Sequence, residues 1–165
     1  MPSSQSYATP RRGVLWALAA LCAAVCLGFL AVLVYSLRTP RAVNEADYPD
    51  PVPTAMRWDI AAAYSDGFLT VEGWACVEDD RFESVDIRPA LLSADGAGWT
   101  LPTWLREDEN ARLAAGDAVF GEYGGFTGRC HTKRLPAGTY ELCIAYRCNG
   151  LSAMIHTGQS VEVAP

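Results

Sequence analysis

The chain of 165 residues carries 19 acidic and 13 basic side chains, which gives a net charge of −6 at neutral pH. Every acidic residue follows residue 44, and the same part of the chain holds nine of the basic residues, so its formal charge is −10. Proteins that bind nucleic acid present a basic surface. This charge balance excludes nucleic acid as an expected partner.

The segment 13–37 contains 25 residues and no charged side chain. As a helix it would be about 37 Å long, more than the roughly 30 Å hydrocarbon core of a bilayer. A cleavable signal peptide has a shorter apolar run, of about 7 to 15 residues, followed by a small-residue cleavage site, and neither feature is present here. We therefore predict an uncleaved transmembrane helix, with the lipid bilayer as its first partner.

Two arginines flank each end of this segment, so the positive-inside rule does not decide its orientation. The acidic C-terminal part and its even set of cysteines favour a short cytoplasmic tail, 1–12, and an extracytoplasmic domain. Within the helix, Ala20, Ala24 and Gly28 recur every fourth residue. This spacing is typical of a helix-packing face, and it also occurs by chance in alanine-rich membrane helices.

Four prolines fall within 38–57, which predicts an extended linker. From residue 58 to 165, short β-rich runs alternate with turn residues, a pattern typical of an antiparallel β-sandwich. Asp66-Gly67 and Asn149-Gly150 predict tight hairpins. Residues 107–115 alone are expected to form a helical turn. The strands are expected at 60–64, 68–76, 84–92, 98–104, 125–131, 139–147, 151–156 and 160–163.

Alternation within 140–148 predicts two faces, because successive side chains of a strand point in opposite directions. Tyr140, Leu142, Ile144 and Tyr146 form the expected core face, and Glu141, Cys143, Ala145 and Arg147 form the other. The segment 68–76 is apolar on both faces, which indicates a strand covered on both sides or a bulge.

The four cysteines of this domain are predicted to form two disulfides. On one strand, Cys143 and Cys148 would lie about 16 Å apart, too far to be bridged. Two pairings remain open: Cys76 with Cys143 and Cys130 with Cys148, or Cys76 with Cys148 and Cys130 with Cys143.

A set of turn and strand residues between Tyr123 and Gly150 resembles an immunoglobulin-like module of bacterial cell-surface and envelope-glycan-associated membrane proteins. The matching residues are Tyr123, Gly125, Phe126, Leu135, Pro136, Gly138, Tyr140, Asn149 and Gly150. Gly73-Trp74-Ala75 resembles an early strand of the same module. The resemblance covers roughly 58–163 and implies an immunoglobulin-like sandwich in the cell envelope. It implies no catalytic residues.

Catalytic chemistry has few candidates in this sequence. His131 and His156 are the only histidines, and neither lies in a motif beside a nucleophile. With Cys130, Cys143 and Cys148 they offer zinc ligands, but without the short paired spacing of known structural sites. The acidic runs 78–80 and 107–109 lack the spacing of a calcium loop. We expect no enzyme activity, no metal and no cofactor.

The leading hypothesis is a membrane-anchored envelope protein that presents its sandwich to a protein partner, through the helix face or an exposed strand edge. The alternative is a glycan-binding module. Its predicted binding residues are Trp99, Trp104, Glu107 and Asp108, because indole rings stack on sugars and carboxylates bind hydroxyls. A third hypothesis, an envelope hydrolase, requires a role for His131 or His156.

Overall fold

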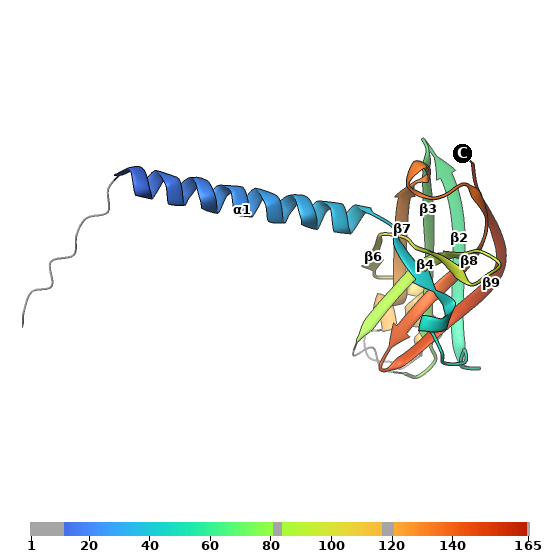
Figure 1. Ribbon diagram of the computed structural model, residues 1–165. Coiled ribbons are helices and arrows are strands. Elements are labelled where there is room, and N and C mark those ends of the chain that lie inside the picture. The colour runs from blue at the N-terminus through green and yellow to red at the C-terminus, as the bar shows by residue number, and fades with distance from the viewer. Residues whose placement is uncertain (1–11, 81–83, 117–120, 165) are drawn as a thin grey trace, which may run out of the picture. The chain divides into compact units, whose positions relative to one another are not determined.

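A computed structural model describes residues 12–80, 84–116 and 121–164. The chain divides into two compact units, an N-terminal helix and a domain that begins at Arg38 (Figure 1).

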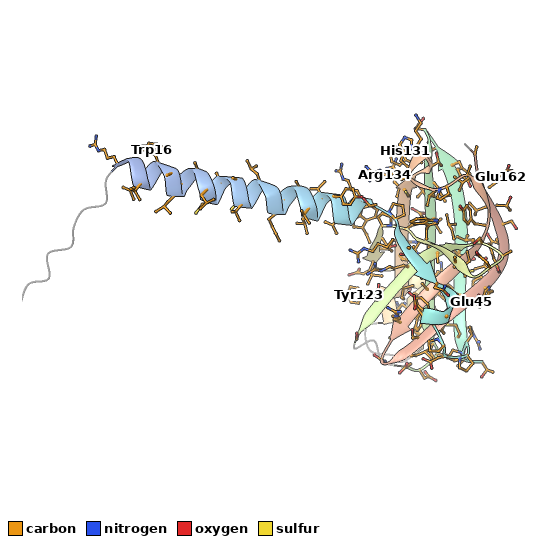
Figure 2. All side chains as sticks on the ribbon, viewed as in Figure 1. Trp16, Glu45, Tyr123, His131, Arg134 and Glu162 are labelled. Atoms are coloured by element: carbon orange, nitrogen blue, oxygen red, sulfur yellow. The ribbon has the colours of Figure 1, made fainter. Side chains whose placement is uncertain are left out.

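The first unit is helix α1, Arg12–Arg38. Its large apolar side chains are exposed on all sides, and Trp16 projects from the first turns (Figure 2). The stretch Arg12–Tyr35 is long and apolar enough to cross a membrane, as an anchor or as a signal sequence. Ala20, Ala24 and Gly28 are exposed, and a methyl group added at Gly28 would contact nothing within 4 Å.

The second unit is a sandwich of two antiparallel sheets, which confirms the predicted fold class (Figure 1). The first sheet has the order β1-β5-β4-β8-β9 and the second has the order β2-β3-β7-β6. The strands are β1 Arg41–Asn44, β2 Met56–Ser65, β3 Phe68–Val77, β4 Val85–Leu92, β5 Ala97–Thr100, β6 Thr103–Arg106, β7 Gly125–His131, β8 Gly138–Cys148 and β9 Leu151–Val163.

Tight turns join two of the strand pairs as the sequence predicts. Asp66-Gly67 connects β2 to β3, and Asn149-Gly150 connects β8 to β9. All four residues have positive φ, between 51° and 87°. Two-residue hairpin loops of type I′ need positive φ at both positions, and Asn, Asp and Gly adopt it most readily.

The main core lies between the sheets, and the predicted faces of β8 are confirmed. Leu142, Ile144 and Tyr146 are fully buried there, with Phe126 of β7 on the other sheet. In β3, Leu69, Val71 and Ala75 face the core. The strand is also covered at one end, where Cys76 lies 3.8 Å from the carbonyl oxygen of Ala111 in helix α2, Glu109–Ala115. This contact with α2 accounts for the burial of Cys76 at this end of the strand.

Two segments differ from the sequence-based expectation. The run 98–104 forms two strands, because Leu101-Pro102 carries the chain from β5 in the first sheet to β6 in the second. The predicted linker is partly ordered: β1 pairs with β5, and a 3-10 turn, η1 (Glu45–Asp47), follows it. We call residues 41–50 the strap: β1 is the edge strand of the first sheet, and the residues that follow it reach across that sheet to β9.

The predicted disulfides are absent from the structure. All six cysteines lie within the described residues, and none of them forms a disulfide. Both open pairings joined Cys143 to Cys76 or Cys130. However, Cys143 lies in a small apolar cluster on the outer face of the first sheet, whereas Cys76, Cys130 and Cys148 belong to the main core. The strand itself separates Cys143 from its predicted partners.

Candidate functional site

The outer face of the first sheet is covered by the strap. A small apolar cluster there contains Ala90, Leu92, Cys143, Ala145 and Met154. Val43 and Tyr48 of the strap pack against this cluster. Burial of this apolar surface holds the strap against the sheet, although the sequence predicts a linker there.

Polar contacts fix the far end of the strap. The guanidinium of Arg147 lies 4.5 Å from the centre of the Tyr48 ring and donates a hydrogen bond to the carbonyl oxygen of Asp47 at 3.1 Å. The backbone N–H of Ser152 donates to Asp50 Oδ2 at 2.7 Å. These contacts join the strap to β8 and β9.

A cavity of about 220 Å³ lies beside these contacts, lined in part by Arg41, Arg88 and Arg147. Three arginines are a common feature of anion sites. Here Asp47 and Asp86 line the same cavity, and Arg88 Nε lies 2.6 Å from Asp86 Oδ1. The positive charge is therefore largely matched within the cavity, and Arg147 already anchors the strap.

At the other end of this face, His156 of β9 lies between two carboxylates. Its Nε2 is 3.0 Å from Glu45 Oε1 of the strap, and its Nδ1 is 3.0 Å from Glu141 Oε2 of β8. The same Nδ1 is 3.8 Å from the sulfur of Cys143. Glu45 is labelled in Figure 2. We call Glu45, Glu141, Cys143 and His156 the His156 cluster.

The electrostatics of the cluster follow from these distances. The hydrogen bond to Glu141 is the main cause that raises the pKa of His156. Burial opposes this effect, and the hydrogen bond to Glu45 raises the pKa further. The hydrogen bond from His156 in turn lowers the pKa of Glu141. Burial, followed by the nearby carboxylates Glu141 and Glu45, raises the pKa of the Cys143 thiol to about 12. Because this pKa is far above 7, the Cys143 thiol stays protonated at neutral pH when no metal ion is bound.

The cluster predicts a pH-dependent stability in metal-free protein. A folded-state pKa above the unfolded value of His156 gives a stabilisation that is complete below about pH 6.5 and is lost as the pH rises through the folded value. NMR titration of the imidazole should give a pKa above 6.5, and Glu45→Gln should lower it. An unchanged pKa in Glu45→Gln would contradict the contribution of Glu45.

Only part of this cluster is predictable from the sequence. Alternation places Glu141 and Cys143 on one face of the strand. His156 is a candidate general base, and His156 and Cys143 are among the candidate zinc ligands. Glu45 was missed because it lay in the predicted linker. The assembly depends on a register shift in β9: Leu142 pairs with Gln159, whereas Cys143 pairs with His156.

The four residues predicted to bind glycan are not brought together on one surface. Trp99 lies on β5 of the first sheet and packs against the main core, whereas Trp104 lies on β6 of the second sheet and is 55% exposed. Glu107 is exposed. Asp108 Oδ1 accepts hydrogen bonds from the first turn of α2, and Asp108 Oδ2 pairs with Arg106 at 2.9 Å. Asp108 therefore caps a helix.

The remaining candidates have structural partners. The ring of His131 packs on Phe68, with the ring centres 4.9 Å apart, and its Nδ1 accepts a hydrogen bond from the Lys133 N–H. Glu78 forms an ion pair with Arg57 at 3.0 Å. Glu109 bonds Arg112 within α2. These contacts are typical of stabilised surface residues.

The second sheet has two edge strands, β2 and β6. The surface around β6 is the more apolar candidate for binding. Among the described strands β6 pairs only with β7. Trp104 and Leu105 are exposed, and so are Leu113 of α2 and Tyr123 of the 3-10 turn η2, Gly121–Gly124.

No known protein family, curated protein or solved structure matches this chain.

Proposed function

We propose that the chain is a non-catalytic, single-pass envelope protein whose sandwich binds an extended segment of another protein by strand addition at β6. In this proposal residues 1–12 are cytoplasmic, α1 remains as the anchor, and the acidic domain is extracytoplasmic. The observation that supports it best is an edge strand that pairs with no described strand on its outer side and carries exposed apolar side chains, because strand edges bind extended peptides through their backbone groups.

The hydrogen-bond pattern supports an available edge. The N–H of Arg129 donates to the carbonyl oxygen of Pro102 at 3.0 Å, across the same antiparallel pair of strands. Hydrogen-bonded and non-bonded pairs alternate along such a ladder. Trp104 therefore bonds toward β7, whereas the backbone groups of Thr103 and Leu105 point away from β7, toward an added strand.

The exposed side chains favour a protein strand as the occupant. Trp104 pairs with Thr127 on the outer side of the sheet, and Leu105 pairs with Phe126 on the core side. An added strand with alternating apolar residues would bury both, since alternate side chains face opposite sides. Trp104 is 55% exposed and Leu105 is 43% exposed, so both have area to lose.

Site-specific cross-linking in native membranes tests this proposal. A photo-reactive amino acid at Glu107, beside β6, should give an adduct of one discrete mass. Leu105→Pro should abolish the adduct, because proline lacks the N–H that would bond the added strand. The change leaves the hydrogen bonds between β6 and β7 intact, since the Leu105 N–H points away from β7. Leu105→Ala keeps that donor and should retain most of the adduct.

A photo-reactive residue at Tyr64, exposed on the opposite edge strand β2, is the matched control. An adduct that forms equally from that position, or that persists in Leu105→Pro, would contradict strand addition at β6. An adduct of twice the mass of the chain would replace the proposed partner with a second copy.

Glycan binding is the second candidate, and it is favoured only by the exposure of Trp104. It predicts saturable co-sedimentation of the full-length protein with purified envelope glycans, lost in Trp104→Ala and weakened in Glu107→Gln. Leu105→Pro should leave glycan binding unchanged, which separates the two functions.

A further inference from the structure

The His156 cluster has the donor set of a transition-metal site. It combines a thiol, an imidazole nitrogen and a carboxylate oxygen, and the three donor atoms of Glu141, Cys143 and His156 all lie within 4.8 Å of one another. Thiolate and imidazole are the typical ligands of zinc, whereas magnesium and calcium select oxygen ligands.

The donor distances are close to those that a bound zinc ion would impose. Bond lengths of about 2.0 to 2.3 Å in a tetrahedral site place nitrogen and oxygen ligands about 3.4 Å apart, and nitrogen and sulfur ligands about 3.5 Å apart. Here His156 Nδ1 lies 3.0 Å from Glu141 Oε2 and 3.8 Å from Cys143 Sγ. These two distances differ from the zinc values by a few tenths of an ångström, and the carboxylate and the thiol lie within 4.8 Å of each other, so a bound ion would draw them closer.

Two further contacts orient these donors. Glu45 accepts from Nε2 of His156 at 3.0 Å, which directs the other ring nitrogen toward Glu141 and Cys143. Histidine ligands of zinc are commonly held by a carboxylate in this way. The N–H of Gly158 donates to Glu141 Oε1 at 3.2 Å and leaves Oε2 facing His156.

The backbone is irregular at the same point. The pairing of β8 with β9 shifts between Leu142 and Cys143, and Gly158 has a φ of +71°. This irregularity places the Gly158 N–H on Glu141 while Cys143 remains opposite His156. Bulges that redirect side chains are frequent beside functional sites.

We propose that Glu141, Cys143 and His156 bind one zinc ion, with Glu45 as the residue that positions His156. The ion would replace the proton shared by His156 and Glu141 and would displace the proton of the Cys143 thiol. Cys143 is fully buried, whereas the side chains of Glu141, His156 and Glu45 are 37–47% exposed, so an ion can reach the site from solvent. This inference is independent of the proposed strand addition at β6.

Titration of the chelator-treated, full-length protein in detergent with Zn²⁺ tests the site. One ion per chain should bind, and Co²⁺ should give the absorption of a tetrahedral ion and a thiolate-to-metal charge-transfer band. Cys143→Ala should remove that band, and His156→Gln should weaken zinc binding by at least about 100-fold. Glu45→Gln should weaken it by about 10- to 100-fold, as expected for a residue that holds a ligand.

Matched controls make the result specific. His131→Gln makes the same change at the other histidine and should leave the zinc affinity unchanged, as should the paired change Cys22→Ala and Cys26→Ala in α1. Circular dichroism checks that each variant is folded. The absence of zinc binding, or of the charge-transfer band in the wild-type protein, would overturn the proposal. Equal affinity in His131→Gln and His156→Gln would do the same.

Discussion

Replacing Phe126 with alanine is expected to lower the free energy of unfolding by about 3 to 5 kcal/mol. Phe126 lies on β7 and has no exposed surface. Its ring also packs against Gly73 of β3, where an added methyl group would come within 2.9 Å of the ring. Removal of the ring would leave a cavity between the sheets that this rigid backbone cannot fill.

Denaturant unfolding of the full-length protein in detergent, followed by tryptophan fluorescence, measures this loss. Trp104→Ala is the control, since it removes a large aromatic side chain that is already 55% exposed. We expect it to change the free energy of unfolding by less than about 1 kcal/mol. Equal losses in the two variants would mean that Phe126 does not contribute the core packing described above.

Gly98→Ala is expected to destabilise the domain by about 3 kcal/mol or more. A Cβ at Gly98 would clash with the carbonyl oxygen of Leu91, a backbone atom of the neighbouring strand β4. Flexible side chains can move away from such a contact, but a paired strand cannot do so without losing its register. Because β5 also pairs with β1, the variant should release the strap as well.

Gly138→Ala is the matched control for this prediction. Gly138 begins β8, and an added methyl group would meet only the Tyr140 ring at an ordinary 3.5 Å. This change should be neutral or slightly stabilising, because alanine has less conformational freedom in the unfolded chain. Hydrogen exchange measures the strap separately: the N–H of Glu45, which bonds the carbonyl oxygen of Gly96, should lose protection in Gly98→Ala only.

The cysteines of the sandwich do not support the prediction that the domain lies in an oxidising compartment. An even number of cysteines favoured an oxidising environment, but the four cysteines of the sandwich are buried and none of them forms a disulfide. Burial raises the pKa of Cys76 and Cys130 to about 11, so both thiols are weak nucleophiles. The proposed extracytoplasmic orientation therefore rests on the acidic charge of the domain and on the anchor.

Local patterns in the sequence predicted most of the elements of this fold. An uncharged run of 25 residues indicated α1, alternation indicated the strands and the core face of β8, and Asp-Gly and Asn-Gly indicated two hairpins. Each of these features depends on residues that lie within a few positions of one another. The helical turn near 107–115 was predictable for the same reason, since its capping residue Asp108 adjoins it.

Contacts between distant segments were decided only by the tertiary structure. Glu45 and His156 are 111 positions apart, and their contact requires the strap to cross the first sheet and β9 to shift its register. Prolines made the strap resemble a linker, although burial of Val43 and Tyr48 holds it in place. The alternation of side chains along a strand shows which face of the sheet each one occupies. Its neighbours on other strands depend on which strands pair and in which register, and short-range sequence patterns do not specify this.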